Sequence, residues 1–219
     1  MKISICIVVK NRSKINYKEK ELILFPNLVK GLAAIKKDHE IELVICDFQS
    51  DDWPLKDWIY EYSDDFKITL IENKEEFSKG MGYNICAKKA ANELLFFCDA
   101  DILIGEGFFE NIEKCIDSGK IWFPIVKYIE ESGVEVFRTQ NGQGLCLITK
   151  TNFNKTDGWP EFYSWGGEDH LFYYKCHALF KIERNQCEFL KHQWHPVEYS
   201  YKYYKNPVQS CFNKHYRKK

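Results

Sequence analysis

The stretch that decides the fold is Leu94-Leu95-Phe96-Phe97-Cys98-Asp99-Ala100-Asp101, in which five apolar residues are followed by two carboxylates. An apolar run of this length, ended by polar residues, predicts a strand buried on both faces of a sheet. Carboxylates are costly to bury unless an opposite charge neutralises them. Because ligands of open α/β sheets bind beyond the carboxyl ends of the strands, we expect Asp99 and Asp101 to bind Mn²⁺ or Mg²⁺. The alternative for such a pair is an ordinary strand end with solvated acids.

The first half of the chain alternates segments typical of strands and of helices. Strands are predicted at 3–9, 41–46 and 67–71, in addition to the stretch that ends at Asp99. Helices are predicted at 19–36, with the first turns displaced by Pro26, and at 55–62 and 80–92. This order is typical of a mostly parallel sheet with helices on its faces, so we predict an α/β fold.

The second half of the chain has a less regular pattern. We predict helices at 108–116 and 168–178, strands at 121–128, 144–148 and 187–192, a loop at 154–167, and an aromatic, basic tail at 199–219. The tail is either a packed C-terminal helix or a contact with an anionic membrane surface. We expect a single domain over 1–219, with a nucleotide-binding half at about 1–101 and an acceptor-binding half at 102–219.

Composition excludes several classes of protein. Apolar residues make up 45% of the 219 residues, charged residues make up 29%, and the net charge is −1, which is typical of a globular protein and not of one that binds nucleic acid. The nine cysteines include no CxxC pair and are expected to be buried free thiols. The apolar run at 3–9 is too short for a signal peptide or a membrane span. We therefore expect a cytoplasmic protein with at most peripheral contact with the inner face of the membrane.

Polar side chains follow three of the predicted strands. They are Lys10-Asn11-Arg12, then Asp47 with Asp51-Asp52, and then Asp99-Ala100-Asp101. In a parallel sheet these carboxyl ends meet at one edge, so we expect the three groups to form one ligand cleft. Ordinary solvated turns are the alternative, which is less plausible for three groups than for one.

A second motif is Trp165-Gly166-Gly167-Glu168-Asp169-His170. The glycines allow close approach of the backbone to a ligand, and the acids open a helix, where the helix dipole stabilises them. The alternative is plain capping of that helix. Trp159 and Trp165 could form a mobile platform that covers a substrate.

A third motif, His192-Gln193-Trp194-His195, follows a predicted strand. An imidazole at that place could complete the metal site begun by the two aspartates. Zinc held with Cys187 is an alternative that lacks a second cysteine pair. The chain contains no glycine-rich phosphate loop of the GxGxxG or Walker kind and no GxSxG serine.

Together these residues resemble glycosyltransferases of the GT-A fold. Residues 5–12, 42–52, 77–85 and 99–101 are similar to the family-2 group of bacterial nucleotide-sugar transferases. Residues 157–169 are similar to the C-terminal motif of β-1,4-galactosyltransferases and chondroitin-polymerising enzymes. The resemblance covers about residues 3–196.

The resemblance implies roles for particular residues. Asp169 would be the catalytic base, and Glu168 would orient the acceptor. Asp101, together with Asp99 and His192 or His195, would hold the metal. The donor site would consist of Val9, Asn11, Arg12, Asp47, Lys79, Asp99, Ala100 and Trp165.

The resemblance also implies an activity. It is metal-dependent, inverting transfer of a hexose or N-acetylhexosamine from a UDP-sugar to a glycan or lipid-linked glycan acceptor, as in bacterial capsule or lipopolysaccharide synthesis. The chain departs from the family at Asp47-Phe48-Gln49, where two adjacent acids and a glycine are common, and at His170, where further acids are usual. The alternatives are a nucleotidyltransferase that makes the sugar nucleotide and a degenerate sugar-binding module.

Overall fold

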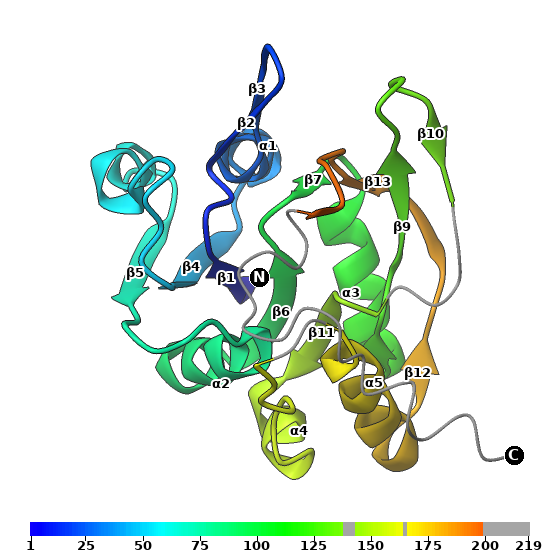
Figure 1. Cartoon of the computed structure of the whole chain (residues 1–219). Coiled ribbons are helices and arrows are strands. Elements are labelled where there is room, and N and C mark those ends of the chain that lie inside the picture. The colour runs from blue at the N-terminus through cyan, green and yellow to red at the C-terminus, as the bar shows by residue number, and fades with distance from the viewer. Residues whose placement is uncertain (138–142, 164–165, 199–219) are drawn as a thin grey trace, which may run out of the picture.

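Strand β6 (Leu94–Asp99) is the middle strand of a seven-stranded sheet in the computed structural model, which describes residues 1–137, 143–163 and 166–198. The strand order is β12-β8-β11-β6-β1-β4-β5. Strands β6, β1, β4 and β5 are parallel, and β11 runs antiparallel to β6 (Figure 1). The other strands are β1 (Lys2–Val9), β4 (Glu40–Asp47), β5 (Lys67–Glu72), β8 (Ile121–Trp122), β11 (Cys146–Thr149) and β12 (Ile182–Glu183). The prediction of a mostly parallel α/β sheet is confirmed.

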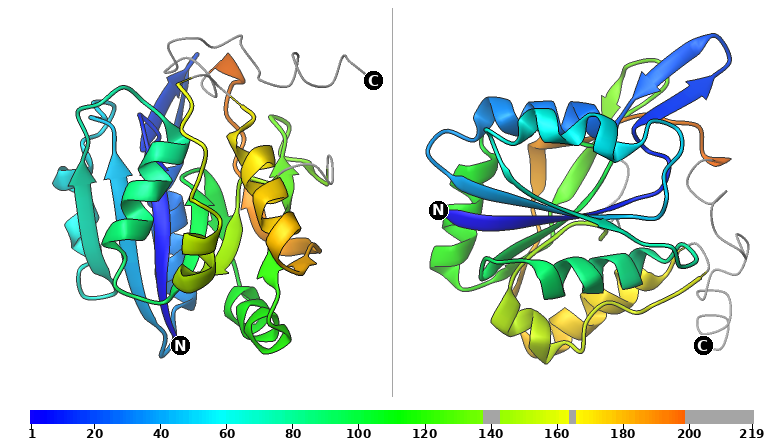
Figure 2. Two further views of the ribbon diagram at one scale, coloured as in Figure 1. Left: turned by 90° about the horizontal axis from the view of Figure 1, so that it is seen from below. Right: turned by 90° about the vertical axis from the view of Figure 1, so that its left-hand side faces the viewer.

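Helices cover both faces of this sheet because successive residues of its strands point to opposite sides. In β1, Ile3, Ile5 and Ile7 belong to one core, and Cys6 and Val8 belong to the other. Figure 2 shows α1 and α2 on opposite sides of the strands. One face carries α1 (Phe25–Ile35), α3 (Phe108–Ser118) and the 3₁₀ turns Leu55–Asp57 and Ile59–Tyr62. The other carries α2 (Lys79–Lys89), α4 (Lys150–Lys155) and α5 (Glu168–Leu179).

A second, smaller sheet brings the C-terminal part of the described chain to the end of β6. Its order is β10-β9-β13-β7, with β7 (Ile102–Ile104), β9 (Ile125–Ile129), β10 (Glu135–Val136) and β13 (Gln186–His192). Strand β7 begins just after the turn that follows β6, and it pairs with β13 so that Ile102 lies opposite His192. The register therefore places the imidazole-bearing end of β13 beside the acid-bearing turn.

The predicted helix at 19–36 is wrong in its first residues. Strands β2 (Lys14–Tyr17) and β3 (Lys20–Ile23) form a hairpin there, and α1 begins at Phe25. Pro26 lies in the first turn of α1, where its missing N–H leaves no hydrogen bond unmade.

Two other boundaries differ from the prediction. The strand predicted at 121–128 is split into β8 and β9 at Phe123-Pro124, because a proline cannot donate to a strand partner. Helix α4 ends at Lys155, so it includes the first two residues of the predicted loop at 154–167. The Thr149 hydroxyl caps this helix by accepting from the Asn152 N–H at 3.1 Å.

Other expectations can be compared with the described residues only. Eight cysteines are free and buried, as predicted, while Cys211 and the tail at 199–219 lie outside the described residues. No helix among residues 1–137, 143–163 and 166–198 is long and apolar enough to cross a membrane.

Candidate functional site

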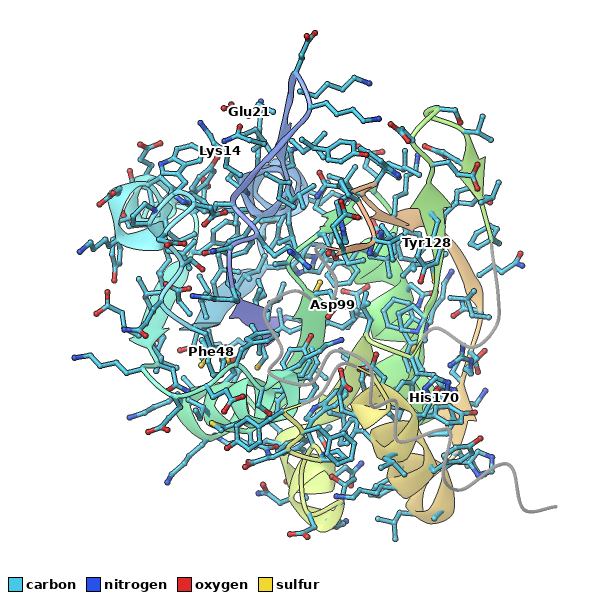
Figure 3. The ribbon with its side chains drawn as sticks, in the orientation of Figure 1. Lys14, Glu21, Phe48, Asp99, Tyr128 and His170 are labelled. Carbon is cyan, nitrogen blue, oxygen red and sulfur yellow. The ribbon has the colours of Figure 1, made fainter. Side chains whose placement is uncertain are left out.

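A cavity of about 500 Å³ opens at the carboxyl ends of β1 and β6. Figure 3 shows Asp99 near the middle of the molecule, with Tyr128 and His170 on the side of β9 and α5, and all three line the cavity. The structure thus gathers side chains from both halves of the chain. The predicted site residues among the lining are Arg12, Lys79, Asp99, Ala100, Asp101, Glu168, Asp169, His192 and His195.

Other residues predicted for the donor site do not line this cavity. The Val9 side chain is fully buried in the core, and its neighbour Val8 lines the cavity instead. Asn11 and Asp47 lie at the adjoining ends of β1 and β4, outside the lining. Trp165 lies outside the described residues.

The ends of β1 and β4 are joined by polar contacts. The Asn11 side chain donates to Oδ1 of Asp51 at 2.7 Å, and the Asn11 N–H donates to the Ser50 hydroxyl at 2.9 Å. The Ser50 hydroxyl donates to Oδ1 of Asp47 at 2.6 Å, and burial raises the pKa of Asp47. The two polar groups predicted to meet at the sheet edge are therefore in direct contact.

The first charged cluster of the cavity, which we call the lysine cluster, consists of Lys79, Tyr83, Asp99 and Asp169. The ammonium of Lys79 lies 2.8 Å from Oδ1 of Asp99 and 3.1 Å from Oδ1 of Asp169. The Tyr83 hydroxyl donates to the same Asp99 oxygen at 3.0 Å. Burial raises the pKa of Asp99, and Lys79 opposes that shift. One cation thus holds two acids that come from β6 and α5.

Local sequence explains how Lys79 reaches this position. The Ser78 hydroxyl accepts from the Met81 N–H at 3.4 Å and caps α2, so Lys79 is the first residue of the helix. Tyr83 follows four residues later and lies on the same helix face. Gly144 forms the opposite wall: a Cβ placed there would lie 2.6 Å from Oδ2 of Asp99. A side chain at this place would therefore require the Asp99 carboxylate to move.

The second charged cluster, which we call the imidazole cluster, consists of Arg12, Asp101, His192 and His195. Nε2 of His195 lies 3.2 Å from Oδ2 of Asp101, and Nε2 of His192 lies 3.6 Å from Oδ1. Nε of Arg12 lies 3.7 Å from Oδ2. Burial opposes ionisation of Asp101, but the two imidazoles and Arg12 outweigh it and hold the pKa of Asp101 well below its usual range. Asp101 is therefore an ionised carboxylate.

The imidazole cluster has the chemistry of a metal site. Potential ligand atoms of Asp101, His192 and His195 all lie within 4.8 Å of one another. Oδ1 of Asp101 is buried and has no hydrogen-bond partner within the described part of the chain. Nδ1 of His195 lies 3.0 Å from the Pro196 carbonyl, which can only accept, so Nδ1 carries a proton and Nε2, which faces Asp101, is the nitrogen that could bind a cation. A carboxylate and two imidazoles fit Mn²⁺.

Two other residues that the sequence offered as metal ligands, Asp99 and Cys187, have different contacts in the structure. Asp99 belongs to the lysine cluster, and the group of close ligand atoms found among the described residues contains Asp101 and not Asp99. Cys187, which a zinc site would use, is buried and its sulfur contacts the Asn185 carbonyl at 3.3 Å. Asp101 with both histidines is therefore the group of side chains that could hold a metal ion.

Glu168 and Asp169 open α5, as the sequence predicts, and Asp169 is a member of the lysine cluster. Gly167 precedes them with φ 102, a conformation that only glycine adopts readily. Glu168 is 5% exposed, and its Oε2 has no hydrogen-bond partner among the residues described. Burial, with a smaller contribution from Asp169, raises the pKa of Glu168 to about 7. The two neighbouring acids therefore have different environments.

Tyr83, Tyr128 and Gln193 are among the residues of the site that were not predicted from the sequence. The position of Tyr83, four residues after Lys79, could have indicated it. Tyr128 stacks on His192 with 4.9 Å between ring centroids. Gln193, which follows His192 in the sequence, is buried. The side chain of Gln193 donates to the Leu24 carbonyl at 3.0 Å. No spacing rule predicts these two contacts, because they join elements far apart in the chain.

The sheet, with a cavity at the carboxyl ends of its parallel strands, is the GT-A fold of glycosyltransferases. The fold of TarS from S. aureus, residues 1–349, matches with a TM-score of 0.70 and 19% identity over 88% of this chain and 60% of that one. TarS in complex with UDP-GlcNAc matches with a TM-score of 0.69 and 20% identity, over 90% of this chain and 59% of that one. The chain belongs to the family described as "Glycosyltransferase like family 2", which matches residues 4–164.

Two relatives have similar sequences. Chondroitin sulfate N-acetylgalactosaminyltransferase 2 of Mus musculus is 27% identical over 159 residues, which are 61% of this chain. Chondroitin sulfate N-acetylgalactosaminyltransferase 1 of Homo sapiens is 28% identical over 153 residues, which are 58% of this chain. The match spans 29% of the length of each of these two relatives.

Proposed function

We propose that the chain transfers an N-acetylhexosamine or hexose from a UDP-sugar to a glycan acceptor, with inversion and with Mn²⁺ as cofactor. The observation that carries this proposal is the presence of the imidazole cluster and the lysine cluster in one cavity. One cluster suits a metal-bound diphosphate, and the other contains the acid that would accept a proton. Transfer of a sugar from a diphosphate needs both functions.

The residues of the imidazole cluster would bind the leaving group. Asp101, His192 and His195 would hold the cation, and Arg12 adds a positive charge beside them. A bound Mn²⁺ supplies stabilisation of the negative charge that develops on the diphosphate. The two imidazoles favour Mn²⁺ over Mg²⁺, which prefers oxygen ligands.

The acids that open α5 would act on the acceptor. Asp169 lines the cavity with a carboxylate that is 26% exposed, so an acceptor hydroxyl can reach it. We assign it as the base that takes the proton of the attacking hydroxyl. Glu168 is buried beside it and would orient the acceptor. Asn11, Asp47 and Lys79 would bind the nucleotide part of the donor.

The relatives support a UDP-N-acetylhexosamine as the donor. Two of them are named as N-acetylgalactosaminyltransferases, and TarS, which shares the fold, has been solved with UDP-GlcNAc. The acceptor, as a growing bacterial surface polysaccharide or a lipid-linked glycan, stays a prediction from the sequence.

Release of UDP from sugar donors tests the proposal. Purified protein is incubated with UDP-, GDP- and CMP-sugars and Mn²⁺, with and without EDTA. We expect UDP release from a UDP-N-acetylhexosamine or a UDP-hexose that stops when EDTA removes the metal. Absence of Mn²⁺-dependent UDP binding would contradict the proposal. Pyrophosphate production from UTP and a sugar phosphate would indicate a nucleotidyltransferase, and metal-independent glycan binding without turnover would indicate a binding module.

The base assignment has its own test. We expect Asp169→Asn to bind UDP at least as tightly as the wild type and to lose transfer by about a hundredfold to ten-thousandfold, the usual contribution of a general base. Unchanged turnover in that variant would show that another group takes the proton.

A further inference from the structure

Lys79 forms ion pairs with two acids of the cavity at the same time. Its ammonium lies 2.8 Å from Asp99 and 3.1 Å from Asp169. The Lys79 side chain is 15% exposed, and the second oxygen of Asp169 also lies 3.5 Å from the ammonium. Asp169, the proposed base, is therefore paired with a cation.

The position of Lys79 is closely defined by its neighbours. The Tyr83 ring lies 5.7 Å from the ammonium, and a Cβ at Gly144 would lie 3.3 Å from it. Burial by itself would lower the pKa of Lys79, but Asp169 and Asp99 outweigh it and raise this pKa well above its ordinary value. Lys79 carries its charge throughout the neutral pH range.

The ammonium occupies the atoms that a base would use. It lies against both carboxylate oxygens of Asp169, and an acceptor hydroxyl would have to donate its proton to one of them. The same ammonium lines the cavity that would receive the donor. A diphosphate carries more negative charge than one carboxylate and forms strong charge-assisted hydrogen bonds, so it competes for Lys79.

We propose that Lys79 exchanges Asp169 for the diphosphate of the bound donor, so that Asp169 becomes free to act as the base only after the donor is in place. This inference rests on the proposed function and adds an order of events to it. The ion pair occupies the carboxylate of Asp169 before a donor is bound, and donor binding releases that carboxylate for the acceptor hydroxyl.

The exchange predicts a sign for the energetic coupling between Lys79 and Asp169. UDP binding with Mn²⁺ is measured by calorimetry for the wild type, Asp169→Asn, Lys79→Met and the double variant. If Lys79 has to leave Asp169, breaking this pair in advance tightens UDP binding by about fivefold or more, a typical size for coupling between sites. In the Lys79→Met background, Asp169→Asn increases the affinity for UDP by a smaller factor. No ion pair remains to be broken there, and only the repulsion between Asp169 and the diphosphate is relieved.

The same four measurements can also contradict the exchange. If Lys79 stays on Asp169, it screens that carboxylate from the diphosphate, and Asp169→Asn then has its larger effect in the Lys79→Met background. A larger or an equal effect in that background overturns the exchange. Wild-type protein that fails to bind UDP with Mn²⁺ contradicts the proposed function itself, so the two failures are distinguishable.

Matched variants separate the ion pair from other effects. At pH 8, above the raised pKa of Glu168, Glu168→Gln removes a neighbouring negative charge that makes no ion pair with Lys79 among the described contacts, and it measures repulsion through space. Lys88→Met removes an exposed lysine of the same helix and should leave UDP binding unchanged. If Lys79→Met does not fold, as judged by thermal unfolding, Lys79→Gln takes its place in the cycle.

Discussion

The hydroxyl of Tyr83 donates a hydrogen bond to Oδ1 of Asp99 at 3.0 Å, from a ring with no exposed surface. The ring packs against Trp159 with 4.9 Å between centroids, so the hydroxyl is held in place by the core. Asp99 is thereby fixed from one side, and its other oxygen faces Gly144 and the cavity. Tyr83 is a positioning residue for Asp99, the acid that the sequence resemblance places in the donor site.

Replacement of Tyr83 by Phe removes this hydrogen bond and keeps the packing. Because hydrogen bonds to charged groups contribute about 1.5–3 kcal/mol, we expect the KM for the UDP-sugar to rise about tenfold or more while kcat changes little. Steady-state kinetics in the donor measures both constants. Tyr60→Phe, at an exposed position, is the control. A fall in kcat with an unchanged KM would show that Tyr83 acts in another way.

The imidazole cluster predicts a loss of metal binding. We expect Asp101→Asn to abolish Mn²⁺-dependent UDP binding, and His192→Ala and His195→Ala each to weaken Mn²⁺ binding by about tenfold or more, because each removes a ligand. Titration of Mn²⁺ followed by electron paramagnetic resonance measures this directly. His177→Ala, at an exposed place on α5, should bind Mn²⁺ normally. Normal Mn²⁺ affinity in both histidine variants would rule out the assignment.

Glu168 predicts a pH dependence of stability. Its pKa rises from 4.5 to about 7 on folding, so the native state favours the neutral acid. The resulting stabilisation is fully present below pH 4.5 and is lost as the pH rises through about 7, with a limit of about 3 kcal/mol at 1.36 kcal/mol per pKa unit. We expect Glu168→Gln to be more stable than the wild type at pH 8 and to lose most of that advantage at pH 4.5. Urea unfolding at the two pH values measures the difference, and an equal difference at both would contradict the shift.

Gly144 predicts a steric requirement at the donor site. A Cβ at this place would lie 2.6 Å from Oδ2 of Asp99, closer than such contacts occur. The Asp99 side chain would have to move, so we expect Gly144→Ala to weaken UDP binding with Mn²⁺ by about tenfold, with a stability cost of about 1–3 kcal/mol from overpacking. Gly105→Ala, where the nearest atom lies at 3.6 Å, is the control. Calorimetry with UDP decides the point, and unchanged affinity would show that Asp99 moves without consequence.

The parallel part of the sheet could be predicted because its strands carry long apolar runs. The bounds predicted for β1, β4 and β5 lie within one residue of the observed ones. The β2–β3 hairpin was missed because Leu22 continues the helical spacing of apolar residues seen in α1. A contact far along the chain favours the hairpin: Tyr17 packs edge to face on Trp194, with 5.7 Å between centroids. Sequence periodicity carries no information about such a contact.

The site could be predicted in its composition more than in its arrangement. An extended backbone would place Asp99 and Asp101 on the same side, but β6 ends at Asp99 and the chain turns at once. The turn separates the two acids, so one faces a lysine and the other faces two imidazoles. The geometry of a turn of this length depends on what packs around it, here the pairing of β7 with β13. The spacing of residues in the sequence alone could not have shown that Asp99 and Asp101 belong to two different clusters.

Hydrogen bonds of Gln193 hold the segment between His192 and His195 in place. The Gln193 N–H donates to the Asp101 carbonyl at 2.8 Å, and the Gln193 side chain also accepts from Asn27 at 3.0 Å, which ties the segment to the start of α1. The three side chains proposed as ligands are therefore held in place by the fold, so binding of a cation would cost little conformational entropy. Affinity for the ion should accordingly depend on how rigidly α1 holds this anchor, at a distance from the ligands themselves.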